Sequence, residues 1–204
     1  MTGQARDDKL CHAIFRPKGD QPLAGNEFPM SKFSKPKQRP CPDMLIKARL
    51  LFLRYAFPCA GITLARGKIS QQQYNNLEKA VLTGHPPSIV NLTRIFGPAW
   101  RRINRLANLI EKSPLDPETI RTYFLKFHNQ DIKQNDGSYA MAPEFLKKLC
   151  RVEKAKIIQV SSDFYLVKIR NKKRAVSKAI CPRAKVGDIV AVHYGYAVEK
   201  FKKK

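Results

Sequence analysis

The stretch Lys185–Glu199, KVGDIVAVHYGYAVE, decides how we interpret the C-terminal quarter of the chain. Its first residues are typical of a turn, because Gly187 tolerates positive φ and Asp188 can bond its own backbone. The following Ile189–Tyr194 combines β-branched and aromatic residues, which favours a strand. Gly195 then interrupts the run, and a glycine inside a strand usually marks a bulge or a barrel corner. A strand that bends and continues is typical of a small closed barrel.

The rest of residues 150–204 has the same strand-like pattern. Short apolar runs alternate with turn-forming segments, and we expect five strands around the runs 157–160, 164–169, 175–180, 189–192 and 197–198. Five short antiparallel strands in about 50 residues predict an OB-like β-barrel. The predicted turns include Asn171-Lys172-Lys173.

Residues 44–130 have helical periodicity instead. Met44–Phe57 is apolar over more than half of its circumference, so we expect a central buried helix that Asp43 caps and Pro58 ends. Asp116-Pro117-Glu118 is a strong start signal for a later helix. The predicted fold class is therefore α+β, an N-terminal helical domain followed by a small OB-like five-stranded barrel. A linker with a short helix, 131–149, joins the two, and residues 1–43 are expected to be a disordered basic arm.

The composition indicates which classes of partner the protein can bind. The 204 residues hold 39 Lys and Arg against 16 Asp and Glu, a net charge of +23. Such a charge favours acidic partners and nucleic acid and says nothing about the fold. The five cysteines, at positions 11, 41, 59, 150 and 181, include no CxxC pair, which favours reduced thiols in a cytoplasmic protein. No apolar run reaches membrane length without charges, and no signal peptide is evident, so we expect no membrane insertion.

Enzymatic motifs are missing from the sequence. It contains no phosphate-binding loop, no GxSxG, no HExxH and no paired carboxylates at catalytic spacing. With so few acidic residues, acid–base catalysis is poorly supported. The sequence therefore predicts a protein that is not an enzyme.

Two C-terminal segments resemble a known family. KVGDIVAVHYGYAVEKF (185–201) is similar to the end, and LCRVEKAKIIQVSSDFYLVKI (149–169) to the start, of the HypC/HybG/HupF family of hydrogenase-maturation chaperones. The likeness covers residues 150–201 and places Cys150 and His193 on the family's cysteine and histidine. Two departures stand out. The family's cysteine opens the mature chain whereas Cys150 is internal, and the Ile-Pro-Gly that follows it is replaced by 152–155.

The resemblance implies an accessory chaperone in [NiFe]-hydrogenase assembly. Such a protein binds a hydrogenase large subunit or a maturation scaffold and transiently carries iron with cyanide and carbonyl ligands at its cysteine, here Cys150. A thiolate is a soft ligand suited to low-spin iron, and His193 can orient it or lower its pKa. A half-buried strand cysteine without a task remains the alternative.

A weaker resemblance concerns the helical domain. LFLRYAFP (51–58) and SPLDPETIRTYF (113–124) are similar to segments of an uncharacterised, mainly actinobacterial family associated with hydrogenase loci. These segments share no residue with the C-terminal match and point in the same direction.

Strand alternation predicts where Cys150 lies. It would share a side with Val152, which faces the core, while Lys154 on the same side turns outward. We therefore expect Cys150 at the barrel rim, partly exposed and near His193.

A nucleic-acid-binding module is the alternative function. Residues 150–204 hold 15 Lys and Arg against 4 Asp and Glu, and OB-like folds often bind single strands through basic grooves and aromatic side chains. Its candidate residues are Arg170, Lys172, Lys173, Arg174, Tyr194 and Tyr196.

Overall fold

The computed structural model describes residues 41–202, so the basic arm expected at 1–43 lies almost entirely outside the described residues. The first helix, α1, spans Pro42–Ala56 and starts two residues earlier than expected. Asp43 lies inside its first turn, and Cys41 occupies the N-cap position without a side-chain hydrogen bond. Pro42 suits this start, because a proline at the first helical position gives up only an amide that would be unpaired anyway.

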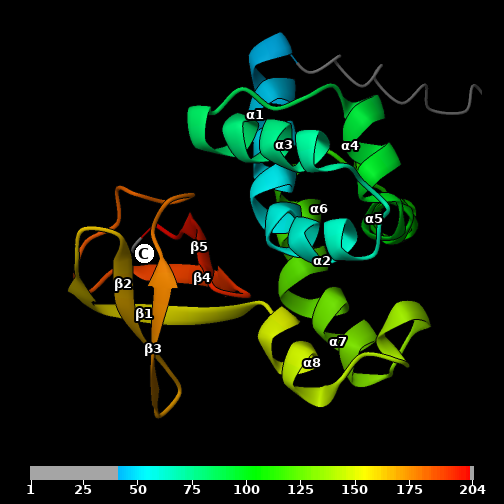
Figure 1. The fold of residues 1–204 in the computed structure, drawn as a ribbon. Helices are drawn as coiled ribbons and strands as arrows, with labels where there is room; N and C mark the ends of the chain where they lie inside the picture. The colour runs from blue at the N-terminus through cyan, green and yellow to red at the C-terminus, as the bar shows by residue number, and fades with distance from the viewer. Residues whose placement is uncertain (1–40, 203–204) are drawn as a thin grey trace, which may run out of the picture. The chain divides into compact units, whose positions relative to one another are not determined.

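Helices occupy the described chain up to Cys150, and strands follow it (Figure 1). The helical segments are α1, η1 (Phe57–Cys59), α2 (Ala60–Ala65), α3 (Gln71–Thr83), α4 (Ile89–Ile95), α5 (Gly97–Leu109), α6 (Pro117–Thr122), the π-helical turn η2 (Tyr123–Phe127), α7 (His128–Lys133), η3 (Gly137–Tyr139) and α8 (Glu144–Cys150). The strands are β1 (Glu153–Val160), β2 (Phe164–Ile169), β3 (Lys172–Ser177), β4 (Ile189–His193) and β5 (Tyr196–Lys200).

The predicted central helix is confirmed as a core element. Phe52, Leu53 and Tyr55 of α1 are fully buried. The continuous run Pro42–Ala65 has the length and hydropathy of a membrane span, but half of its most apolar window is buried inside the protein. From Ala48 to Ala56 the residues of α1 are buried or half-buried on every side, as the centre of a helical core requires, whereas Met44 and Ile46 near its start are exposed.

The five strands close into a barrel in the order β1-β2-β3-β5-β4, which confirms the predicted fold class. β1 pairs antiparallel with both β2 and β4, and β2 pairs antiparallel with β3. One expectation was wrong: β3 and β5 run parallel, and they meet through Ser177 and Tyr196. This order leaves β4 beside β1 at one side of the barrel and β5 beside β3 at the other.

Two local expectations are corrected. Gly195 does not mark a bulge in one bent strand, because Tyr194 and Gly195 form the tight turn between β4 and β5. The irregularity of this pair lies instead between Ala191 and Val192. The expected turn at Lys172-Lys173 belongs to β3, since the chain already reverses at Arg170, whose φ is 53°.

The helices and the barrel share a core. Alternate residues of β4 face different sides: Val190 and Val192 belong to the barrel interior, whereas Ala191 packs with the helical core. The helical core also includes Val152, Ile180 and Val198. Residues 39–204 accordingly form one compact unit. The boundaries expected near 43, 130 and 149 stay predictions.

A buried polar cluster at this interface connects α1 and α6 with β5. Glu199 of β5 is 9% exposed. Its carboxylate accepts a hydrogen bond of 2.7 Å from the Tyr55 hydroxyl and bonds of 2.7 to 3.1 Å from the Arg121 guanidinium. Burial, followed by the charge of Glu199, raises the pKa of Tyr55, so this hydroxyl stays a donor. A carboxylate removed from water needs such partners.

We predict that Arg121→Gln lowers the free energy of unfolding by about 1–2 kcal/mol, because it leaves the buried Glu199 carboxylate without its cation. The figure lies below the cost of a fully buried pair since the Arg121 side chain is 41% exposed. Urea unfolding measures the change. The control Arg94→Gln alters an exposed arginine and should stay within about 0.5 kcal/mol. Equal effects of both variants would contradict the role of this cluster.

Candidate functional site

Three side chains from distant parts of the sequence meet where the helices contact the barrel. Cys59 ends η1, Cys150 is the last residue of α8, and His193 ends β4. The Cys59 and Cys150 sulfurs are 3.9 Å apart, and His193 Nε2 lies 3.5 Å from the first and 3.7 Å from the second. These three donor atoms form the thiol–imidazole cluster, a set that can hold a metal ion.

His193 is held in one tautomer. Its side chain is fully buried, and Nδ1 lies 2.7 Å from the Tyr55 carbonyl oxygen. A carbonyl only accepts, so Nδ1 carries the proton and Nε2 keeps its lone pair. That lone pair points at the two sulfurs. Metal-binding histidines are commonly oriented by such a hydrogen bond from the other ring nitrogen.

The turn after His193 is strained and held from both sides. Tyr194 has a φ of 53°, in the left-handed region that costs a non-glycine residue about 1–2 kcal/mol. Its amide donates to the Leu149 carbonyl at 2.9 Å, and its own carbonyl accepts from Arg174. The first of these bonds ties the turn to the residue before Cys150. The strained turn thus fixes His193 beside Cys150.

The two thiols have opposite acidities. The hydrogen bond from Cys59 lowers the pKa of Cys150 most, against the opposing effect of burial, and the contact with His128 lowers it further. The hydrogen bond to Cys150, burial and the neighbouring negative charge all raise the pKa of Cys59. Of the two thiols, Cys150 therefore gives up its proton more readily, and Cys59 keeps its proton to higher pH.

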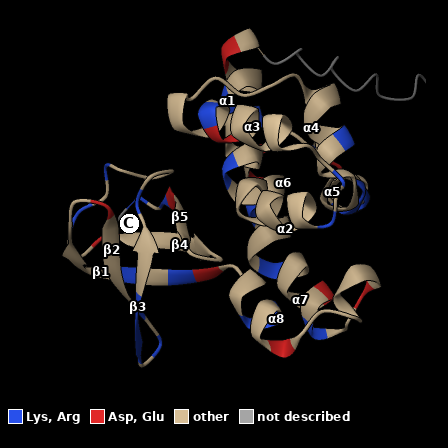
Figure 2. Cartoon of the chain, in the orientation of Figure 1, with Lys and Arg blue, Asp and Glu red and all other residues tan. Residues whose placement is uncertain are grey.

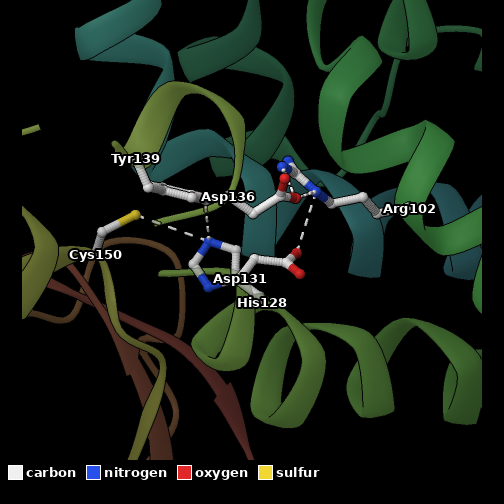
Figure 3. Close-up of polar contacts among 6 residues, drawn as sticks. All are labelled: Arg102, His128, Asp131, Asp136, Tyr139 and Cys150. Carbon is white, nitrogen blue, oxygen red and sulfur yellow. Dashed lines mark hydrogen bonds and ion pairs between the residues drawn. The ribbon is translucent and has the colours of Figure 1, made fainter. Parts of the chain in front are cut away.

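A second histidine lies on the other side of Cys150. His128 Nε2 is 3.8 Å from the Cys150 sulfur and 3.1 Å from the Tyr139 hydroxyl, as Figure 3 shows. Further out, Arg102 bridges Asp131 at 3.2 Å and Asp136 at 2.6 Å. His128 follows the π-helical turn η2, and such turns often occur at functional sites. These residues of the helical part surround the Cys150 sulfur on the side away from His193's strand.

A pocket of about 200 Å³ reaches the cluster on the Cys59 side. Cys59, His128 and Tyr194 line it together with three cationic side chains, Arg66, Lys68 and Arg102. Cationic walls favour anionic ligands. The pocket gives a small anion a route to the Cys59 sulfur.

The two predicted site residues do meet, but the predicted partial exposure of Cys150 was wrong. Cys150 is 4% exposed and His193 is fully buried. The reason is that Cys150 ends a helix and does not begin a strand, so strand alternation does not apply to it, and the helices cover the barrel at this point. Sequence reasoning missed Cys59 and His128. Cys59 directly follows the segment LFLRYAFP, but 91 residues separate it from Cys150, so no spacing rule connects them.

The candidate residues for nucleic-acid binding differ in how exposed they are in the structure. Arg170, Lys172 and Lys173 are exposed at the β2–β3 hairpin, where Figure 2 shows basic residues. Tyr194 and Tyr196 are half-buried, and Tyr196 packs edge-on against Phe57 with ring centroids 6.0 Å apart. Arg174 is bonded to the Tyr194 carbonyl. Nucleic-acid binding at these residues stays a prediction.

We predict that the folded protein at pH 7 shows the ultraviolet absorbance of a thiolate and that Cys150→Ser abolishes it. The lowered pKa means that the thiolate is protonated only when the pH falls well below the usual range of a thiol, about 8.5. Cys181→Ser is the control, because burial raises the pKa of Cys181 and keeps it protonated. Equal absorbance of wild type and Cys150→Ser at pH 7 would contradict the assignment.

Comparison with known proteins gives one match, which covers the barrel segment. No curated protein and no solved structure gives a match to the chain. The matched family segment contains His193 and starts four residues after Cys150. Residues 154–204, the barrel and the residues after it, match the model of the HupF/HypC family.

Proposed function

We propose that this chain is an accessory chaperone of [NiFe]-hydrogenase assembly, which binds a hydrogenase large subunit or a maturation scaffold. Its cargo is iron with cyanide and carbonyl ligands, bound at Cys150 and His193. The observation that carries the proposal is the approach of these two side chains, 3.7 Å apart, inside a chain whose barrel segment matches the HupF/HypC family.

The chemistry of the pair suits such a cargo. A thiolate sulfur and an imidazole nitrogen are ligands that iron accepts, and sulfur favours low-spin iron. The lowered pKa of Cys150 provides the thiolate, and the hydrogen bond from Nδ1 to the Tyr55 carbonyl leaves Nε2 free to bind. Cyanide ligands make the cargo anionic, and Arg66 and Lys68 lie in the adjacent pocket.

Burial of the pair sets a condition on transfer. Cys150 and His193 have almost no exposed surface, so a client cannot reach the iron until the covering segments move. α8 is the candidate for that movement, because it is a short helix of seven residues that carries Cys150 at its end. The proposed partner therefore has to displace α8 to receive the cargo.

We predict that the protein, purified from a host that makes active hydrogenase, contains iron and co-purifies with a hydrogenase large subunit or a maturation scaffold. Cys150→Ser and His193→Gln should lose most of the iron, because each removes one ligand, while the folded chain remains. Metal analysis and mass spectrometry of the purified complex measure both results. Cys181→Ser, which alters a cysteine of the barrel part away from the pair, should behave as wild type.

Absence of both iron and any hydrogenase subunit from the wild-type preparation would argue against the proposed function. Loss of iron in the Cys181→Ser control as well would show that the signal does not report on Cys150.

A further inference from the structure

We propose that Cys59 is a third metal ligand, so that Cys59, Cys150 and His193 bind one metal ion between the helices and the barrel. The inference goes beyond the proposed function: a tetrahedral site with one open position takes a simple divalent ion such as Zn²⁺, whereas the cargo iron of the proposed function brings its own cyanide and carbonyl ligands. The added ligand comes from outside the family-matched segment. The chain would then supply three of the four ligands of a tetrahedral ion.

The edges of the thiol–imidazole cluster match a tetrahedral site. Metal–sulfur bonds of about 2.3 Å and metal–nitrogen bonds of about 2.0–2.1 Å at tetrahedral angles place sulfurs about 3.8 Å apart and sulfur about 3.6 Å from nitrogen. The observed separations are 3.9 Å between the sulfurs and 3.5 and 3.7 Å from the sulfurs to Nε2. All three edges therefore agree with a single shared ion.

Neighbouring residues fix the positions of the three ligands. Cys59 follows Tyr55 by four residues, so the helical run that orients His193 through the Tyr55 carbonyl also carries Cys59. Cys150 is fixed through the bond between the Leu149 carbonyl and the Tyr194 amide. A site whose ligands are already placed binds without the cost of ordering them.

The fourth position of the ion is supplied from the pocket. Cys59 lines that pocket, whereas Cys150 and His193 do not. Three protein ligands with an open fourth position are typical of sites that accept water or an external ligand, whereas structural sites are closed by four protein ligands. Arg66 and Lys68 in the pocket wall favour a small anion at this position, whereas the charge of Arg102 is already paired with Asp131 and Asp136.

Titration of the reduced full-length chain with Co²⁺ tests the proposal, because sulfur-to-cobalt charge-transfer absorbance grows with the number of thiolates bound. We expect one Co²⁺ per chain, the intense visible bands of a tetrahedral ion, and displacement by Zn²⁺. Cys59→Ser should retain about half of the charge-transfer absorbance and weaken Co²⁺ binding by about tenfold or more. Binding should also release protons, since the proton on Cys59 must leave.

Two controls isolate Cys59. Cys41→Ser and Cys181→Ser alter the other described cysteines and should leave the spectrum unchanged. X-ray absorption of the zinc-loaded wild type counts bound sulfurs without any substitution and should give two, so the result does not depend on how well Cys59→Ser folds.

Different results would overturn different statements. One bound sulfur, or an unchanged Co²⁺ spectrum and affinity in Cys59→Ser, overturns Cys59 as a ligand and leaves Cys150 and His193 as the proposed carrier pair. A wild type that binds neither Co²⁺ nor Zn²⁺ overturns the three-ligand site. Conversely, two bound sulfurs in a protein that never associates with a hydrogenase subunit would support this site and overturn the proposed function.

Discussion

Tyr55 holds two neighbouring strands of the barrel against α1 with two different atoms. Its carbonyl oxygen accepts from His193 at the end of β4, and its hydroxyl donates to Glu199 in β5. Its ring stacks on Phe124 at 5.0 Å, which adds a third attachment from the helical side. The position of β4 relative to Cys59, and with it the thiol–imidazole cluster, depends on these contacts.

The π-helical turn η2 also helps to place the thiol–imidazole cluster. The chain around it presents Phe124 to Tyr55 and His128 to Cys150, and the ring centroids of the two histidines lie 5.3 Å apart. Aromatic rings therefore help to cover Cys150 and His193, while Cys59 stays in contact with the pocket. In surroundings with little water, a sulfur anion is stabilised mainly by the few donors that reach it, which here are Cys59 and His128. This is why a buried thiol can still be acidic.

The sequence predicted the barrel well and the site only in part. The β-branched runs and their turns indicate five strands, because strand propensity and turn chemistry are local properties. Cys150 and His193 were paired by resemblance, and the structure places them in contact.

The apolar circumference of α1 shows that the helix is buried, but it does not tell which surface covers it, so nothing local indicates that Tyr55 faces β4 and β5. For the same reason Cys59 could not be found: its partners lie 91 and 134 residues away, and only the packing of α1 on the barrel brings them near. The prediction that Cys150 is partly exposed was wrong because Cys150 ends a helix and does not begin a strand.

The wide separation of the three donors along the chain has a consequence for biosynthesis. Cys59 emerges from the ribosome first, Cys150 follows it by 91 residues and His193 by 134. β4 must pair with β1 and β5 before its histidine has a fixed position, and β5 follows β4 along the chain. A nascent chain whose β5 has not yet emerged thus has separate thiols but no complete site, and a metal ion has to be delivered after β5 has left the ribosome.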